Sequence, residues 1–265
     1  MRKTLGLALG AGGARGVAHI GFLKALEENG IRPDYISGSS MGSIVGACCA
    51  KGMKADDMKE IIQKLKANDI VDIGILPLSK LGLMKWTKTR RLLSSFLEDC
   101  RFSDLKIPFC CVAVDIRSGT LQVFSEGSVT DAILASSSMP TVFRPVEKDG
   151  MLLVDGGVLC RVPVRQVKKM GADVVVAVDL LGPCLPSDKP SNMISLITRV
   201  YDIMDSARTA DERRKTRRIA DLWLEPDMPG VSQYTVKYHS SAYDAGYKLG
   251  RENADTIKAL LKEEA

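Results

Sequence analysis

The sequence lacks several features that define common classes of protein. No stretch reaches the roughly 18 consecutive apolar residues that a membrane-spanning helix needs. Histidine occurs only twice, and the seven cysteines include no C-x-x-C pair. The net charge of +5 is too small to indicate nucleic-acid binding, although it is compatible with an anionic membrane surface. We therefore expect no resident metal, no nucleic acid as a partner and no transmembrane segment.

The cysteines predict reduced thiols rather than a disulfide framework. Their number is odd, and two pairs are adjacent, at residues 48–49 and 110–111. Both pairs lie in apolar stretches, where cysteine usually serves as a small core residue. This usage is typical of a cytoplasmic protein. Residues 1–16 carry two cations before an apolar run, but a strand that leads into a glycine loop explains them better than a signal peptide.

Apolar periodicity predicts strands and helices that alternate along the chain. Predicted strands cover residues 4–10, 34–38, 109–116, 121–124, 151–157, 173–180 and 220–226. Predicted helices cover residues 16–30, 43–52, 55–69, 128–138 and 162–171, a long stretch after residue 190, and a last segment from about residue 241. Such alternation predicts an α/β fold with a central, mostly parallel sheet and helices on both faces. No linker is visible, so we expect one domain over residues 1–265.

Two segments do not fit the alternation of strands and helices well. Residues 70–91 are apolar, interrupted by glycine and proline, and end in cations. This stretch is a candidate lid or lipid-contacting surface, with Leu83, Met84 and Trp86 beside the cations, or else a loop packed on the core. The charged run at 208–218 is best explained as the solvated face of a helix.

The predicted helix after residue 190 has an apolar side. This side consists of Ile194, Ile197, Tyr201 and Met204. A stripe of this kind packs internally, forms a dimer contact or touches lipid. Core packing is the commonest outcome and is the one we expect.

The pattern G-x-S-x-G occurs at residues 38–42, between a predicted strand and a predicted helix. In this context it predicts a nucleophile elbow, a strained turn that presents the central residue, Ser40. Neighbouring side chains would clash on such a turn, and Gly38 and Gly42 remove those clashes. Short patterns of this kind also arise by chance, so Ser40 alone does not define a function.

A second glycine-rich segment, GAGGARG at residues 10–16, follows the first predicted strand and opens a helix. Successive N–H groups at such a position can bind an anion. Arg15 replaces the last glycine of G-x-G-x-x-G, and the Gly-Lys-Ser/Thr of the P-loop is missing, which disfavours a nucleotide-binding module. An oxyanion hole needs only a few convergent N–H groups, and Gly12 and Gly13 can supply them.

Asp155 is a candidate base for Ser40. It ends a predicted apolar strand and is followed by Gly156 and Gly157. Ligands of open α/β sheets bind at the carboxyl ends of the strands, so we expect Ser40 and Asp155 to project to the same edge. The ordinary pKa of aspartate is about 3.9, and contact with Ser40 plus desolvation would make it a stronger base. A simple Asp-Gly turn is the alternative.

The two histidines provide a rival interpretation. His19 lies among apolar residues of the first predicted helix and is expected in the core. His239 follows Ser40 and Asp155 in the chain order of an α/β-hydrolase triad. A Ser-Asp-His triad therefore stays open, although no clear strand ends at His239.

Taken together, GAGGARG, GSSMG and DGG in this order resemble the patatin-like phospholipase family. The stretches ASSSMPTVFRPV (135–146) and AVDIRSG (113–119) are similar to further segments of that family. The resemblance covers residues 5–180 and is to the compact bacterial members. It implies a three-layer sandwich that hydrolyses an acyl ester of a phospholipid, lysophospholipid or neutral lipid, without metal or organic cofactor.

The resemblance also implies roles for individual residues. Asp155 would take the proton of Ser40 in a catalytic dyad, and the oxyanion would be held by N–H groups of Gly12, Gly13 and Ala14. Arg15 would orient the loop, meet a lipid phosphate or form a structural ion pair. An acyltransferase and a non-enzymatic lipid-binding regulatory protein on the same scaffold are alternatives. We expect a cytoplasmic protein with peripheral membrane contact, and the sequence does not indicate an oligomeric state.

Overall fold

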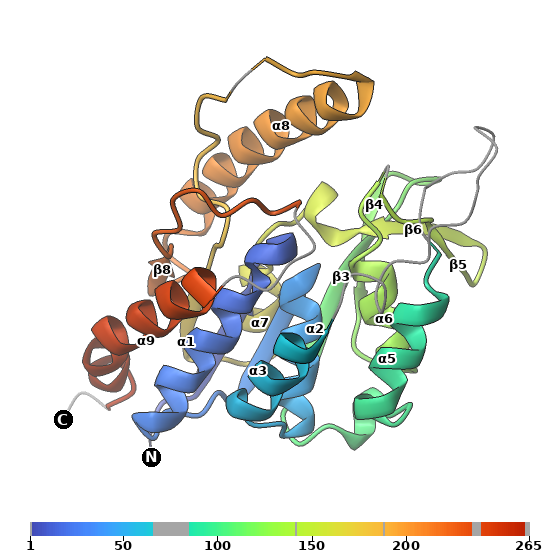
Figure 1. Ribbon diagram of the computed structural model, residues 1–265. Coiled ribbons are helices and arrows are strands. Elements are labelled where there is room, and N and C mark those ends of the chain that lie inside the picture. The colour runs from blue at the N-terminus through green and yellow to red at the C-terminus, as the bar shows by residue number, and fades with distance from the viewer. Residues whose placement is uncertain (1, 66–84, 141, 188, 235–239, 263–265) are drawn as a thin grey trace.

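The computed structural model describes residues 2–65, 85–140, 142–187, 189–234 and 240–262 (Figure 1). The strands are β1 (Leu5–Leu9), β2 (Tyr35–Ser39), β3 (Phe109–Asp115), β4 (Thr120–Phe124), β5 (Val146–Lys148), β6 (Met151–Asp155), β7 (Val174–Val178) and β8 (Leu222–Leu224). The α-helices are α1 (Val17–Glu28), α2 (Met41–Lys51), α3 (Ala55–Lys64), α5 (Thr87–Leu97), α6 (Val129–Ser136), α7 (Val164–Lys169), α8 (Met193–Thr216) and α9 (Ser240–Leu260). Short 3-10 helices occupy Gly13–Gly16, Phe102–Asp104 and Gly156–Val158.

The predicted α/β architecture is confirmed. The eight strands form one sheet in the order β5-β6-β3-β2-β1-β7-β8, with β4 also paired to β3. The pairs β1–β2, β1–β7, β2–β3 and β7–β8 are parallel, whereas β3–β4, β3–β6 and β5–β6 are antiparallel. The sequence did not predict β5, which is too short to show an alternation, or α5. Among the described helices, none combines the length and hydrophobicity that crossing a membrane requires.

The helices cover both faces of the sheet, because the side chains of the central strands β1 and β7 are apolar on both faces. Strands β1 and β7 are buried along their whole length, which explains their uninterrupted apolar sequences. Leu7 and Val176 pack into a large core with α1, α2, α6 and α9. Ala8 and Val175 face the other way, into a smaller core with Val167 of α7. The smaller side chains on this second face leave room for α7 to lie close to the sheet.

The register of β3 brings two strands together end to end. β4 pairs with residues 111–115 of β3, while β2 pairs with 109–112 and β6 pairs with 113–115. A strand has only two edges, so the overlap with β4 places β2 and β6 on the same, opposite edge. These two strands run in opposite directions, and they therefore point toward each other along one edge of β3.

The two facing strand ends carry the segments that sequence reasoning singled out. β2 ends at Ser39, opposite Val112, and β6 ends at Asp155, opposite Ala113. Asp155 thus comes close to the end of β2 on an antiparallel strand. The two strand ends meet at one edge, as expected, but the sequence did not indicate that β6 runs antiparallel to β3.

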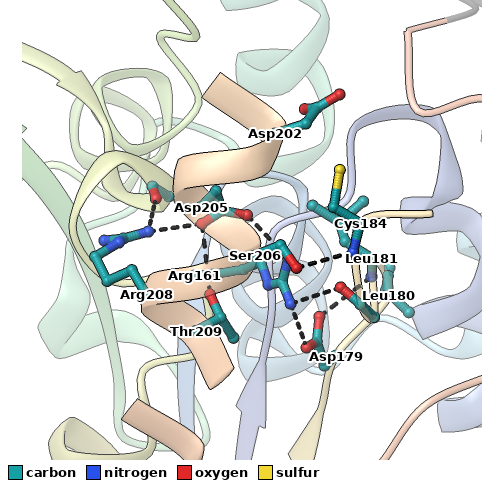
Figure 2. A network of polar contacts seen from close by, with 12 residues as sticks. Arg161, Asp179, Leu180, Leu181, Cys184, Asp202, Asp205, Ser206, Arg208 and Thr209 are labelled. Carbon is teal, nitrogen blue, oxygen red and sulfur yellow. Dashed lines mark hydrogen bonds and ion pairs between the residues drawn. The ribbon is translucent and has the colours of Figure 1, made fainter. Parts of the chain in front are cut away.

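Buried ion pairs attach α8 to the rest of the protein (Figure 2). Arg161 donates from Nη2 to Asp179 Oδ2 at 2.8 Å and from Nη1 to Asp205 Oδ2 on α8 at 2.9 Å. The side chains of these three residues are at most 5% exposed. Arg208 donates to Asp205 Oδ1 at 2.6 Å and to the carbonyl oxygen of Gly157 at 2.7 Å. This network joins α8 to the residue after β7 and to the turn after β6.

The network corrects two expectations about α8. Arg208 belongs to the charged run that was expected to be a solvated face, yet it is engaged with Asp205 and Gly157; farther along, Arg214 is exposed as expected. On the apolar side that was expected in the core, Ile197 and Met204 are 46% and 66% exposed instead, whereas Tyr201 is partly buried and turned toward Gly157. The polar side of α8 is the one that packs on the protein.

We expect Arg161→Leu to lower the free energy of unfolding by about 3–5 kcal/mol, because Asp179 and Asp205 would stay buried without their cation. Denaturant titration of both proteins measures the difference. The matched control is Arg165→Leu, which removes a half-exposed pair with Glu212 and should cost less than about 1 kcal/mol. Equal losses in the two variants would contradict the structural importance of the buried network.

Candidate active site

Ser40 forms a sharp turn between β2 and α2. Its backbone has φ 53° and ψ −127°, a region that residues other than glycine rarely adopt. The chain is crowded on both sides of this turn. A Cβ atom added to Gly38 would lie 2.5 Å from Cα of Ser43, and one added to Gly42 would lie 2.2 Å from the carbonyl oxygen of Leu9. Glycine is therefore required at both flanking positions of the pattern.

Hydrogen bonds hold the strained turn in place. The Ser40 N–H donates to Oγ of Ser136 at 3.0 Å, and the Ser40 carbonyl oxygen accepts from the Oγ and N–H of Ser43 at 2.6 and 2.8 Å. Helix α2 begins at Met41, so Ser40 lies at the positive end of a helix dipole. Sequence reasoning noted the serine-rich stretch around Ser136, but no pattern distinguishes the hydroxyl that supports Ser40.

The side chains of Ser40 and Asp155 are in direct contact. Ser40 Oγ donates to Asp155 Oδ2 at 2.6 Å, and the other carboxylate oxygen accepts from the Gly157 N–H at 2.7 Å. Close packing also constrains the turn after Asp155, since a Cβ atom on Gly156 would lie 2.3 Å from the carbonyl oxygen of Val112. No side chain stands between the hydroxyl and the carboxylate.

The surroundings of Asp155 change its acidity. The residue is only 4% exposed, and burial raises the pKa of its carboxyl to about 7. The hydrogen bonds from Ser40 and Gly157 oppose this effect, while the negative charge of Asp205 adds to it. A carboxylate with a pKa near neutrality is well suited to accept and return a proton at physiological pH.

The glycine loop after β1 lies beside this pair. Gly12, Gly13 and Ala14 line the same cavity as Ser40 and Asp155. Within the described part of the chain, the N–H groups of Gly12 and Gly13 have no hydrogen-bond partner. The Ala14 N–H, in contrast, donates to the carbonyl oxygen of Gln233 at 3.0 Å. Two of the three expected donors are therefore unengaged within the described residues, and the third is already engaged.

Arg15 contacts the backbone of two other segments. Its Nε donates to the carbonyl oxygen of Val231 at 2.7 Å, and its Nη1 donates to that of Leu180 at 3.1 Å. Burial lowers the pKa of the guanidinium. These contacts tie the glycine loop to the chain that follows β7 and β8, as a loop-orienting residue would.

A cavity of about 820 Å³ opens in front of Ser40. One wall is apolar and consists of Val17, Ile44, Ile62, Trp86, Val142 and Phe143. The opposite wall is formed by α8, with Thr198, Arg199, Tyr201 and Asp202. A volume of this size, lined mostly by apolar groups with a few polar ones, is typical of sites for small organic ligands.

Trp86 belongs to the segment 70–91, and the structure assigns it to the apolar wall. Its ring stacks on Phe143 with centroids 4.1 Å apart, and its Nε1 donates to Ser138 Oγ and to the carbonyl oxygen of Arg144. Trp86 thus packs against the protein, while a lid or lipid-contacting role for the segment 70–91 stays a prediction. Residues 66–84, with Leu83 and Met84, lie outside the described residues.

The histidines do not enter the described site. His19 is fully buried, and its Nε2 lies 2.8 Å from the carbonyl oxygen of Gly10. Burial lowers its pKa to about 4, as expected for a core histidine. His239 lies outside the described residues. In the part of the chain that is described, no three His, Cys, Asp or Glu side chains are grouped as metal ligands.

Comparison with known proteins places this geometry in a family. The family model for patatin-like phospholipase matches residues 7–168, more than half of the chain. An uncharacterized NTE family protein of Mycobacterium tuberculosis is 37% identical over 176 residues, which cover 66% of this chain and 49% of the relative. Lysophospholipase nte1 of Aspergillus fumigatus is 28% identical over 286 residues, which cover 97% of this chain and 18% of the relative.

A solved structure agrees with the fold. VipD from Legionella pneumophila superposes with a TM-score of 0.65 over 96% of this chain and 67% of its own, at 15% identity, which is a similarity of fold alone. The chain spans about half the length of the mycobacterial relatives it matches. The family match includes the glycine loop, Ser40 and Asp155, whereas α8 lies beyond it. The chain therefore belongs to the patatin-like phospholipase family.

Proposed function

We propose that the protein hydrolyses acyl esters of lipids, in the manner of a phospholipase A or lysophospholipase, through a dyad of Ser40 and Asp155. The observation that carries the proposal is the 2.6 Å hydrogen bond from Ser40 Oγ to the buried carboxylate of Asp155, at a strained turn that faces a largely apolar cavity. Membership of the patatin-like phospholipase family and the name of the Aspergillus relative support a lipid as the substrate.

The geometry supports a two-step reaction. Asp155 accepts the Ser40 proton while Oγ attacks the ester carbonyl carbon, and it then donates that proton to the departing alcohol oxygen. Water, deprotonated by Asp155, then attacks the acyl carbon; the bond to Ser40 Oγ breaks, Asp155 returns the proton to Oγ, and the fatty acid leaves. Because Ser40 Oγ donates directly to Asp155, this scheme needs no histidine between them.

The negative charge that develops on the carbonyl oxygen needs donors. The open N–H groups of Gly12 and Gly13 supply them, and the N-terminus of α2 adds a favourable potential. Loss of one such donor typically costs about 3 kcal/mol of transition-state stabilisation. Arg15 acts on this step through the position of the loop. The apolar wall receives the acyl chain, and the polar wall formed by α8 faces the head group.

We expect Ser40→Ala and Asp155→Asn each to reduce hydrolysis of lysophosphatidylcholine at least about a thousandfold, because nucleophile and base act as one unit. Thermal unfolding should show that both variants keep the fold. His239→Ala is the control for a triad and should retain near-wild-type activity. A loss of several orders of magnitude in folded His239→Ala would favour a Ser-Asp-His mechanism instead.

A fluorophosphonate probe tests the proposed nucleophile directly, since such probes react with activated serines. Peptide mapping should locate a single adduct on Ser40, and Asp155→Asn should label far more slowly because the hydroxyl loses its base. Neither effect requires knowledge of the natural substrate. Absence of labelling in folded protein with detergent present would refute the enzymatic proposal and favour a lipid-binding protein on the same scaffold.

The pKa of Asp155 predicts the pH dependence of the reaction. The base must be ionised, so kcat/KM for a neutral soluble ester should rise about tenfold per pH unit below pH 7 and level off above it. A stopped assay over a series of buffers measures this profile. An inflection near pH 4 would contradict the assignment, because an Asp base with an ordinary pKa, or His19, titrates there.

The same pKa predicts an effect on stability. The carboxyl of Asp155 binds its proton more tightly in the folded protein than in the unfolded chain, so its contribution to stability is lost as pH rises from about 4 to about 7. Asp155→Asn stays neutral at every pH. The stability of this variant relative to wild type should therefore increase between about pH 5 and pH 8, measured by denaturant titration at both values. A constant difference would argue against a buried, hard-to-ionise carboxyl.

A further inference from the structure

The outward face of α8 carries a continuous stripe of large apolar side chains, here called the α8 stripe. It consists of Met193, Leu196, Ile197, Val200, Ile203 and Met204. The exposed fractions of these residues range from 46% for Ile197 to 70% for Met193. Their spacing of three and four residues places them on one side of the helix. Figure 1 shows α8 at the outer margin of the molecule, at the top of the view.

The inward face of the same helix is mostly polar, with Tyr201 as an aromatic residue that lines the cavity. Asp205 and Thr209 are each only 5% exposed, and Asp205 belongs to the buried network of Figure 2. Thr198 and Asp202 line the catalytic cavity. An ordinary surface helix turns its apolar side to the core, and α8 does the opposite. Contiguous exposed apolar surface of this kind marks an interaction site in soluble proteins.

The α8 stripe reaches the rim of the catalytic cavity. Residues 189–192 line the cavity, and they are followed directly by Met193, the first residue of the stripe. Leu185, which is 70% exposed, lies just before this part of the rim in the chain. Whatever covers the α8 stripe therefore also lies against the mouth of the cavity.

Farther along α8, the same side of the helix becomes basic. A period of 3.6 residues places Arg214 and Lys215 in line with the α8 stripe, and both are exposed. Their partner is Asp211, in surface ion pairs that contribute little to stability. The exposed Arg217 and Arg218 follow at the end of the helix. An apolar segment followed by cations matches an anionic lipid bilayer, which offers acyl chains to the first and phosphates to the second.

We propose that the α8 stripe and its basic end form a docking surface for an anionic lipid bilayer, which holds the cavity mouth against the membrane. The choice of lipid rests in part on the proposed hydrolysis of lipid esters, and independently on the cations. A second copy of this chain fits less well. Specific protein interfaces use about 20–30 residues a side, and the α8 stripe has six.

Vesicle flotation tests the proposal with the full chain carrying Ser40→Ala, so that no lipid is consumed. The vesicles contain either phosphatidylcholine alone or an equal mixture with phosphatidylglycerol. We expect the triple variant Ile197→Gln, Val200→Gln, Met204→Gln to bind both kinds at least tenfold more weakly. We expect Arg214→Gln with Lys215→Gln to weaken binding to the anionic vesicles only.

Matched controls separate docking from folding and from catalysis. Ile116→Gln with Val123→Gln changes two side chains of similar exposure, 48% and 50%, outside α8 and should bind as the parent does. With Ser40 intact, the triple variant should hydrolyse a soluble short-chain ester within twofold of wild type. If the triple variant were poorly folded by circular dichroism, Met193→Gln with Leu196→Gln would replace it.

Three results would overturn the proposal. The first is that the triple variant binds vesicles as well as the parent does. The second is that the parent does not bind vesicles. The third is that the parent binds no vesicles but forms a dimer, and the triple variant is a monomer. Failure of the wild-type protein to hydrolyse the soluble ester has a different meaning. It would refute the proposed reaction while the flotation result still decides whether the α8 stripe docks on lipid.

Discussion

The hydrogen bond between Ser40 and Asp155 depends on one edge of β3. Two strands that run in opposite directions end there, opposite the adjacent residues Val112 and Ala113. The register leaves no room for a side chain at Gly156, where a Cβ atom would meet the carbonyl oxygen of Val112 on β3. Glycine at 38 and 42 is required by the tight turn itself and by the close approach of β1. The strained backbone of Ser40 persists because its neighbours determine its position from every side.

The second constraint comes from α8, which lies outside the part of the chain that the family model matches. Its inner face borders the cavity. Arg208 donates to the carbonyl oxygen of Gly157, whose N–H donates to Asp155. Burial of ions on this scale is expensive and rarely adds net stability compared with an apolar contact. We therefore attribute the polar inner face of α8 to the cavity that this face borders. The apolar residues of the helix then lie on its outer side.

Local patterns in the sequence predicted much of this site. The strand and helix periods predicted the fold class, and the three glycine-containing motifs pointed to Ser40, the loop at Gly12 and Gly13, and Asp155, which line one cavity in the structure. Their catalytic roles stay predictions. What sequence reasoning missed depends on contacts between distant segments. The antiparallel direction of β6 follows from pairing with β3, and Gln233, far along the chain, occupies the Ala14 N–H. The exposure of Ile197 and Met204 on α8 was not predicted, because an apolar period shows that one face differs from the other and not which face is buried.

The acidity of Asp155 connects these features. Burial alone would keep the carboxyl protonated, and a protonated carboxyl is not a base. The hydrogen bonds from Ser40 and Gly157 favour the ionised form, whereas the charge of Asp205 disfavours it. Arg161 and Arg208 pair with Asp205 and so limit its repulsion of Asp155. The buried network thus does more than attach α8: the charge of Asp205 on this helix adds to the effect of burial and raises the pKa of Asp155.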